Sequence, residues 1–414
     1  MTQSVRIDSL AFGGYGVGRL DSGKAVLVTG AAPGDVLSVT IEREKGSHVF
    51  ATIDSILEPS PDRVEPLCGH ADRCGSCSWQ HISVATQRRW KHSLIVDELA
   101  HAGLLDDPEA VPEVAGGEAL GYRTRSRMHL RGGAFGTMQR RSRTVVPFRG
   151  CPVLTPELEE LALDVSQSIA GAPDADVELY VDTLGQRGML VALTGASPAR
   201  AWERIASENG VFSYRIRRPG SPPGPEGRLL FEDSAGTPIA FEPGVFVQTN
   251  RDANAILVDR AMDAAGRGGS FAEIYAGAGN FTVHLCSRFE QGHAAEPDPL
   301  AARMLRRNMR SSSSTVEVLE KTDAQAARSL CASPAVDVLL ADPPRSGMKP
   351  LYPVFDSSPP ARTVIVSCHP MAAVRDLNHL VNNAGYVLEK VVPVDMFPQT
   401  DHLELVAVAA LPGA

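Results

Sequence analysis

Hydrophobic and polar positions follow one pattern in the first part of the chain and another in the last. From residue 1 to about 58, short runs alternate between hydrophobic and polar residues and are separated by glycine-rich or charged turns. The turns fall at Gly13-Gly14, Asp21–Gly23, Pro33–Asp35 and Lys45-Gly46. Five such runs in so short a stretch predict a small OB-like β-barrel, assigned to residues 1–59.

From about Phe241 onward, buried-type strands alternate with loops and helical segments. This repeat predicts a Rossmann-like, doubly wound α/β domain over residues 241–414. Residues 60–240 between the two patterns predict a central mixed α/β domain. Its expected elements are helices at Thr86–Leu104 and Pro156–Ile169, strands at Val177–Val181 and Gly188–Thr194, and a flexible loop at residues 217–228.

Two short apolar runs in the last domain end in polar residues and proline. They are Val336–Arg345 (VDVLLADPPR) and Val364–Pro370 (VIVSCHP). Parallel strands end in this way at the reactive edge of a sheet, so Asp342 and Cys368 are expected at neighbouring strand tips. Cys368 is a candidate nucleophile if the strand tip lowers its pKa. The alternative is a buried structural cysteine.

Length and composition limit the classes of protein to consider. The chain has 414 residues, of which 43% are hydrophobic and 21% charged, as in a soluble protein of two or three domains. No apolar run reaches membrane-span length and the N-terminus lacks a signal-peptide pattern, so a cytoplasmic protein without a membrane partner is expected. A monomer is the default expectation. The net charge of −9 argues against a globally basic nucleic-acid binder but permits a local basic stripe.

Three of the seven cysteines, Cys68, Cys74 and Cys77, lie within ten residues of one another. In a reducing compartment such clustering indicates a metal or iron–sulfur site rather than disulfides. Cys151, at a turn before proline, is the candidate fourth ligand. Four thiolates suit a 4Fe–4S cluster, and a triplet plus a distant single cysteine favours it over a structural zinc site, whose ligands more often come as two close pairs. The expected role is that of a structural staple.

An arginine-rich stretch without Asp or Glu runs from Gly121 to Gly150. Alternation along a strand is expected to put Arg123, Arg125 and Arg127 on one face, with Arg131 further along. A row of guanidiniums fits a phosphate backbone, so these four arginines are candidate RNA contacts. The alternative is a solvated edge strand protected by charge.

A glycine-rich turn follows the first strand of the last domain, in FAEIYAGAGNFTVHL (271–285). Gly277-x-Gly279 permits close backbone approach to a ligand, and Asn280 offers a polar contact. Glu296, about 20 residues on, is placed to accept ribose hydroxyls. The turn lacks the third glycine of a dinucleotide site, which favours S-adenosylmethionine. Asp323, after the third strand, is placed where an adenine amino group would fall.

The motifs together resemble the RNA uridine-5-methyltransferase family over essentially the full length. The order of barrel turns resembles the TRAM domain, and the other motifs are the four cysteines, FVQTN (246–250), EIYAGAGNFT (273–282), DPPRSG (342–347), VSCHP (366–370) and DMFPQTDHLELV (395–406). The resemblance implies a class I methyltransferase fold and a 4Fe–4S cluster. The cofactor site it implies comprises Gln248, Tyr275, Asn280, Glu296, Asp323 and Asp342. It further implies Cys368 as nucleophile and Glu404 as general base, while His369 stands where the family usually has Asn.

The implied reaction makes chemical sense. A thiolate that adds to C6 of uracil activates C5 toward a sulfonium methyl group, and a base must then remove the C5 proton. HLELV is expected to be a short strand that brings Glu404 back to the sheet edge; the alternative is a surface glutamate. The target base must be unstacked, and barrel plus cluster resemble the ribosomal RNA branch, so 23S rRNA is favoured and tRNA is the alternative. The competing hypotheses are an N-methyltransferase and a non-catalytic RNA-binding protein.

Overall fold

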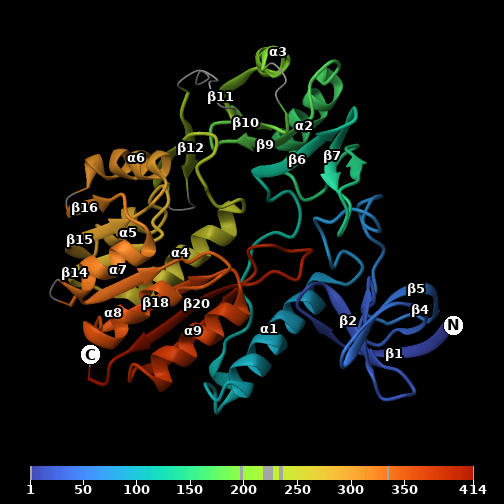
Figure 1. Cartoon of the computed structure of the whole chain (residues 1–414), viewed down its shortest axis with the longest axis horizontal. Coiled ribbons are helices and arrows are strands. Elements are labelled where there is room, and N and C mark those ends of the chain that lie inside the picture. Colours follow the sequence, from blue (N-terminus) through green and yellow to red (C-terminus); the bar gives the residue numbers. More distant parts are fainter. Residues whose placement is uncertain are drawn as a thin grey trace.

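The computed structural model describes residues 2–195, 199–217, 227–232, 236–312, 314–332 and 335–413. A barrel, a central sheet and a larger C-terminal sheet make up the chain, and helix α1 (Val84–His101) lies between the barrel and the C-terminal part (Figure 1). Most of the loop predicted at 217–228 lies outside the described residues. No helix in the described part of the chain is both long and apolar enough to cross a membrane.

The N-terminal strands close into a barrel in the order β1-β2-β3-β5-β4, which confirms the predicted barrel. Alternate residues such as Val26 and Val28 are fully buried, because successive side chains of a strand point to opposite faces. Gly18 lets strand β1 approach closely, since a Cβ there would lie 2.2 Å from the Arg6 carbonyl oxygen. The strands are β1 (Thr2–Ala11), β2 (Tyr15–Arg19), β3 (Ala25–Thr29), β4 (Val36–Lys45) and β5 (His48–Glu58).

Helix α1 follows the cysteine-rich loop and begins at a side-chain cap. The Ser83 hydroxyl accepts a hydrogen bond from the Thr86 amide, which satisfies one of the free N–H groups of the first turn. Lys91, Ile95 and Leu99 recur every four residues and are fully buried, so they mark the packed face of the helix. A short 3₁₀ helix, η1 (Pro108–Ala110), follows α1.

The central sheet has the order β11-β10-β9-β6-β7-β8, with helices α2 and α3 packed against it. The predicted strands at Val177–Val181 and Gly188–Thr194 are β9 and β10, and the predicted helix at Pro156–Ile169 is α2. A two-stranded hairpin, β12-β13, adjoins this sheet. The bounds are β6 (Arg125–Arg131), β7 (Ala134–Met138), β8 (Val145–Pro147), α2 (Pro156–Ser168), β9 (Ala175–Val181), β10 (Arg187–Leu193), α3 (Arg200–Glu208), β11 (Val211–Arg217), β12 (Leu229–Glu232) and β13 (Pro238–Phe241).

The C-terminal sheet has seven strands in the order β16-β15-β14-β17-β18-β20-β19. The first five in this order run parallel and β20 runs antiparallel to both of its neighbours. Helices pack on both faces through two hydrophobic clusters, one including Leu377 of α9 and the other Leu257 of α4, as the doubly wound pattern predicted. The strands are β14 (Gly268–Ile274), β15 (Phe289–Ala295), β16 (Thr315–Leu319), β17 (Val338–Ala341), β18 (Arg362–Ser367), β19 (Val387–Val394) and β20 (Glu404–Ala410).

Strand β20, which begins at Glu404, lies between β18 and β19 in the interior of the sheet. Because β20 runs antiparallel to β18, its first residue lies at the carboxyl edge of the parallel strands, where the sequence predicted Glu404. All seven of its residues are buried. The helices around the sheet are α4 (Arg251–Ala265), α5 (Thr282–Leu285), α6 (Pro299–Asn308), η2 (Met309–Ser311), α7 (Asp323–Cys331), η3 (Lys349–Leu351), α8 (Tyr352–Ser357) and α9 (Pro370–Asn382).

Candidate functional site

Three reactive side chains meet at the carboxyl edge of the C-terminal sheet. Asp342 directly follows β17, and Cys368 directly follows its parallel neighbour β18. Strands β18 and β20 pair Ser367 with Leu405, so one further step of this antiparallel register places Cys368 opposite Glu404. The sequence prediction that Asp342 and Cys368 lie at neighbouring strand tips is confirmed.

Burial makes this edge unfavourable for negative charge. It raises the pKa of Cys368 to about 11, and the Glu404 and Asp342 carboxyls add to the rise. This overturns the expectation that the strand tip lowers the pKa of the thiol. Burial likewise raises the pKa of Asp342 to about 7 and holds the pKa of Glu404 well above its ordinary value. Arg345 is the cation that opposes these shifts at Cys368 and Glu404.

Glu404 is only 3% exposed, which excludes a surface glutamate. A buried carboxyl with a raised pKa beside a partly buried thiol is the arrangement expected at a site of acid–base chemistry.

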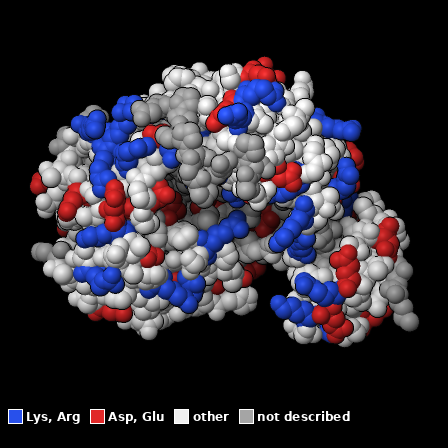
Figure 2. Space-filling model, turned by 45° about the horizontal axis from the view of Figure 1, so that its top comes forward, with Lys and Arg blue, Asp and Glu red and all other residues white. Residues whose placement is uncertain are grey.

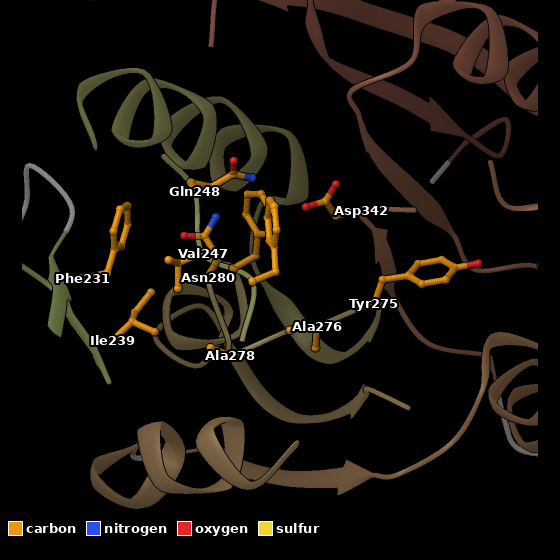
Figure 3. A pocket seen from close by; sticks show the side chains of 12 residues that line it. Phe231, Ile239, Val247, Gln248, Tyr275, Ala276, Ala278, Asn280 and Asp342 are labelled. Carbon is orange, nitrogen blue, oxygen red and sulfur yellow. The ribbon is translucent and has the colours of Figure 1, made fainter. Parts of the chain in front are cut away.

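A cavity lies beside Asp342, between the glycine-rich turn and the hairpin β12-β13 (Figure 3). Four of the six predicted cofactor residues line it: Gln248, Tyr275, Asn280 and Asp342. The rest of the wall is mostly apolar, with Phe231, Ile239, Val247 and Phe281 among its members. An apolar cavity with a few convergent polar groups suits a small organic ligand.

The other two predicted cofactor residues, Glu296 and Asp323, do not line this cavity, but each accepts a hydrogen bond from a residue that does. The Glu296 carboxylate accepts hydrogen bonds from the amides of Gly277 (2.9 Å) and Asp298 (2.8 Å). Asp323 accepts a hydrogen bond from the Tyr275 hydroxyl at 2.8 Å, and in Figure 3 this ring points away from Gln248 and Asn280. The nucleoside contacts expected of Glu296 and Asp323 stay predictions.

Glu273 is a buried carboxyl that the sequence motifs did not single out. It lies on β14 beneath the glycine-rich turn and is 1% exposed, and its Oε2 accepts a hydrogen bond from the Thr282 hydroxyl. Its Oε1 has no hydrogen-bond partner among the residues that the structure describes. Burial raises the pKa of Glu273 to about 8. The signal in the sequence was a glutamate inside an otherwise apolar strand.

Glu273→Gln is expected to raise the midpoint of thermal unfolding at pH 8 and to leave it unchanged at pH 4. The folded-state pKa lies above the ordinary value of 4.5, so the folded state holds this proton more tightly than the unfolded chain does. Stability is therefore lost as the pH rises from about 4.5 through about 8, and glutamine removes that loss. Calorimetry of the cofactor-free protein at both pH values measures the effect; a destabilised variant at pH 8 would contradict it.

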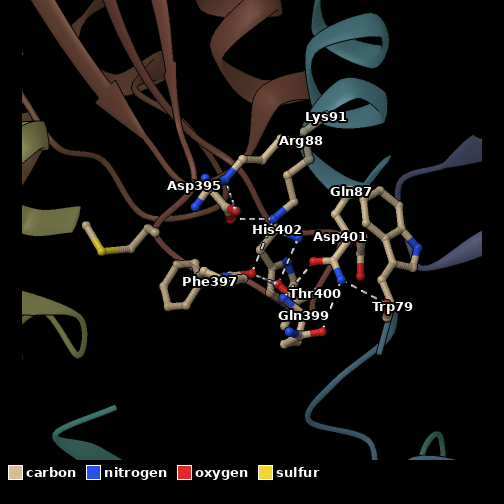
Figure 4. A network of polar contacts seen from close by, with 12 residues as sticks. Trp79, Gln87, Arg88, Lys91, Asp395, Phe397, Gln399, Thr400, Asp401 and His402 are labelled. Atoms are coloured by element: carbon tan, nitrogen blue, oxygen red, sulfur yellow. Dashed lines mark hydrogen bonds and ion pairs between the residues drawn. The ribbon is translucent and has the colours of Figure 1, made fainter. Parts of the chain in front are cut away.

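The loop between β19 and β20 leads directly into Glu404 and is held by side chains of α1 (Figure 4) and by a contact with the barrel. The Lys91 ammonium donates to Asp395 Oδ1 at 2.6 Å and to the Phe397 carbonyl at 3.2 Å. Gln87 and Gln399 exchange two hydrogen bonds, of 2.8 and 3.0 Å.

The same loop is tied to the barrel through Asp401. This carboxylate accepts hydrogen bonds from the Ser78 hydroxyl and the Gly13 amide, both at 2.7 Å. Segments nearly 400 residues apart in the sequence therefore set the position of the loop in front of Glu404.

Lys91→Met is expected to lower stability by roughly 3–5 kcal/mol, because it leaves the Asp395 carboxylate buried without its closest counter-charge. Both side chains are fully buried. In the double variant with Asp395→Asn the loss is expected to be smaller, since no uncompensated charge remains. Thermal unfolding of the single and double variants measures the coupling. If the stability loss of the double variant equalled the sum of the losses of Lys91→Met and Asp395→Asn, the ion pair would not act as a unit.

The four predicted cluster ligands come from two distant segments and face one region. Cys77 and Cys151 pack in one small cluster with Tyr122 and Val153. Cys68 and Cys74 lie near enough to raise the pKa of the Cys77 thiol, and Cys68 also acts on Cys151. All four are free thiols. Within the described ranges, no three His, Cys, Asp or Glu side chains are drawn close enough together to hold a metal ion.

The arginine stretch is only partly as predicted. Arg123 precedes β6, so it does not continue the strand face of Arg125 and Arg127. Its guanidinium turns inward and donates to the Tyr122 hydroxyl at 3.2 Å. Two others have partners on the neighbouring strand β9: Arg127 pairs with Glu178 at 3.4 Å and Arg131 with Asp176.

Arg125 is placed differently. Its guanidinium lies over the exposed Phe246 ring, 4.7 Å from the ring centre, and Phe246 lines the cavity. Of the four candidate RNA contacts, Arg125 is therefore the one that lies beside the ligand site.

A seven-stranded sheet with one inserted antiparallel strand and a glycine-rich turn over an apolar cavity defines a class I methyltransferase fold. A solved structure of similar fold, a tRNA (uracil-54, C5)-methyltransferase of Pyrococcus abyssi in complex with S-adenosyl-L-homocysteine, matches with a TM-score of 0.74 and 21% identity. The match covers 98% of this chain and 99% of that one.

Proteins of similar sequence identify the family within the class I methyltransferases. A 23S rRNA (uracil(1939)-C(5))-methyltransferase of Aromatoleum aromaticum is 32% identical over 97% of this chain and 98% of its own length. An uncharacterised RNA methyltransferase of Thermotoga maritima is 28% identical over 98% of both chains. Residues 1–53 match the TRAM domain. The chain belongs to the family of RNA uracil-C5 methyltransferases with an N-terminal TRAM domain.

Proposed function

We propose that this enzyme methylates C5 of a uridine in 23S rRNA, with S-adenosylmethionine as methyl donor. The observation that carries the mechanism is the register that places Cys368 opposite Glu404, with Asp342 beside them and the ligand cavity adjacent. The choice of 23S rRNA is supported by relatives of that name at about 30% identity over nearly the whole chain.

In the proposed mechanism Cys368 is the nucleophile. Its partly exposed thiol gives its proton to solvent, and the thiolate sulfur adds to C6 of the uracil, which moves the C5–C6 electron pair toward the C4 carbonyl and makes C5 an enolate-like carbon. S-adenosylmethionine, when bound, supplies the electrophilic methyl group that C5 takes. The raised pKa of Cys368 means that the thiolate needs a nearby cation, and Arg345 is that cation in the free enzyme.

Glu404 completes the reaction as the general base. Its carboxylate removes the C5 proton, the electron pair returns to form the C5–C6 double bond, and the Cys368 sulfur leaves. The buried position of Glu404 suits this step, because a desolvated carboxylate is a stronger base than one in water. The cofactor is held by Gln248, Tyr275, Asn280 and Asp342 at the cavity wall, with Glu296 and Asp323 behind them.

The target uridine has to leave its stack to reach Cys368, because the thiol lies at the end of a buried sheet. Arg125 lies over the Phe246 ring, which lines the cavity, and is the arginine best placed to meet an extruded nucleotide. Phe246 itself is 57% exposed, so its ring remains accessible to the RNA.

The four cysteines are proposed to bind a 4Fe–4S cluster. Their donor set, four thiols from a triplet and a distant single residue, fits such a cluster chemically. The cluster would join the loop after the barrel to the start of α2. Domain limits of 1–59, 60–240 and 241–414 are proposed from the changes in sequence pattern and the separate barrel and sheets, with the cluster in the second domain.

Protein purified without oxygen is expected to be brown, with about four iron atoms per chain and a broad absorption band in the visible region. Cys151→Ser is expected to lose the iron and to unfold at a lower temperature, because one of the four proposed cluster ligands is removed. Cys331→Ser is the matched control, since Cys331 lies far along the chain on α7. A colourless protein with one zinc per chain would overturn the assignment.

Mapping of 5-methyluridine by mass spectrometry in a strain that lacks the gene tests the choice of substrate. Loss of one 5-methyluridine in 23S rRNA is expected. Loss confined to tRNA would overturn the ribosomal assignment while leaving the reaction in place.

A further inference from the structure

Two arginines lie over one pair of aromatic rings where the barrel meets the central sheet. Tyr15 of β2 and Phe50 of β5 form the pair, with ring centres 5.4 Å apart. The Arg43 guanidinium carbon lies 4.4 Å from the centre of Phe50. That of Arg141 lies 4.5 Å from the centre of Tyr15 and 5.9 Å from that of Phe50. We call these four residues the barrel clamp.

The two guanidiniums of the clamp are not neutralised. Within the described residues, neither Arg43 nor Arg141 has an acidic side chain within ion-pair distance. Two other cations of the barrel are paired, Arg6 with Glu58 and Lys24 with Glu44. In Figure 2, Lys and Arg side chains flank the notch between the barrel and the rest of the molecule. Both cations lie within 6 Å of the centre of the same Phe50 ring, and two cations without acidic partners in one place attract an anion.

The backbone at Arg141 adopts an unfavourable conformation. Its φ of 54° lies in the left-handed region, which residues other than glycine rarely adopt. Such strain persists where the surroundings impose it, and it is found most often at functional positions.

The turn that carries Arg141 is anchored on the cysteine loop. The Gly75 amide donates to the Met138 carbonyl at 3.0 Å and the Arg140 amide to the Arg73 carbonyl at 3.1 Å. The Arg140 guanidinium donates to the Cys77 carbonyl at 2.8 Å. Arg141 is thus positioned toward the barrel by the segment that holds three of the four cysteines.

We propose that Arg43 and Arg141 together bind one phosphate group of the RNA substrate, so that the RNA bridges the barrel and the central sheet. A guanidinium fork matches phosphate oxygens, and two forks orient one phosphate from two sides. Phosphate is favoured over a stacked base because guanidiniums already cover the ring faces. The rings preorganise the two cations by cation–π attraction. This inference rests only on the RNA substrate and not on which RNA is methylated.

Salt titration of RNA binding tests the clamp. The variants are Arg43→Ala and Arg141→Gly, and the probes are a 23S rRNA transcript and a tRNA transcript. Each variant is expected to bind on the order of tenfold more weakly at low salt, as for a lost hydrogen bond to a charged group. The slope of log affinity against log salt is expected to fall by about 0.7, the value for one released counterion on a single strand. KM for RNA should rise while kcat at saturating RNA stays unchanged.

Glycine at position 141 separates binding from folding, because it relieves the left-handed backbone while removing the guanidinium. Its unfolding midpoint is expected to equal or exceed that of the wild type. Arg6→Ala is the matched control, since it removes one barrel arginine that already has an acidic partner.

Unchanged affinity and slope in both clamp variants would overturn the proposal, as would an equal loss in Arg6→Ala. Weaker binding with an unchanged salt slope would also overturn it, in favour of base stacking. Because both RNAs are probed, the clamp is tested in the same way whether the substrate is 23S rRNA or tRNA.

Discussion

Cys368→Ala is expected to abolish methylation of RNA and to form no covalent adduct with RNA that contains 5-fluorouridine. The wild type is expected to form such an adduct, because fluorine at C5 cannot be removed as a proton and the Cys368–C6 bond is then trapped. Loss of the nucleophile removes the covalent route altogether, so activity should fall by at least about 10³-fold. A gel-shift under denaturing conditions, with radiolabelled RNA, measures the adduct.

The matched control is Cys331→Ser, which removes a thiol at the end of α7 and is expected to retain the adduct and full activity. An adduct that survives Cys368→Ala would contradict the assignment of the nucleophile.

The pH dependence supplies an independent measurement on the same residue. Because the pKa of Cys368 is about 11 in the free protein, the thiolate fraction rises about tenfold per pH unit between pH 7 and 9. The rate of adduct formation should rise with it as long as bound RNA leaves that pKa high. A rate that is constant from pH 6 upward would mean that the site lowers the pKa of the thiol once RNA is bound.

Glu404→Gln is expected to stall the enzyme after methyl transfer. The methylated uridine remains bonded to Cys368 because no carboxylate removes the C5 proton, so an adduct with ordinary uridine RNA accumulates. Turnover should fall on the order of 10²–10⁴-fold, the usual contribution of a general base. Mass spectrometry of the adduct should find the methyl group already on the base.

Glutamine at position 404 also removes one of the carboxyls that raise the pKa of Cys368. The first step, adduct formation with 5-fluorouridine RNA, is therefore expected to reach its maximal rate at a lower pH than in the wild type. Slower release of the methylated product, together with adduct formation that is favoured at lower pH, is expected of a general base. A residue that only maintains the fold would slow both steps.

Glu389→Gln on the neighbouring strand β19 is the matched control, because Glu389 is exposed and pairs with Arg362. It is expected to behave as the wild type in both assays. Normal turnover of uridine RNA by Glu404→Gln would show that another group removes the C5 proton.

Much of the fold could be predicted because the signals are local. Alternation with period two marked the barrel strands, and apolar runs that end in proline placed Asp342 and Cys368 at strand tips. The glycine-rich turn was recognised because few residues other than glycine adopt the φ of 57° and 104° found at Gly277 and Gly279.

The charges around those residues could not be predicted in the same way. The stretch from Gly121 to Gly150 contains no acid, yet Arg127 and Arg131 pair with carboxylates of β9, about 50 residues further on. Arg123 turns inward for a similar reason, since Tyr122 beside it is fixed by the Pro398 carbonyl. Ion pairing depends on which strands are neighbours, and a local window contains no information on that.

The sequence by itself determined the barrel, the alternation of strands and helices in the C-terminal domain, and the identities of the candidate nucleophile and base. Only the tertiary structure decided that β20 enters the middle of the sheet, where Glu404 is buried opposite Cys368 and both pKa values rise. It also decided that Lys91 and the barrel hold the loop in front of Glu404. The physical reason is that backbone patterns depend on nearest neighbours along the chain, whereas burial and charge depend on residues that only folding brings together.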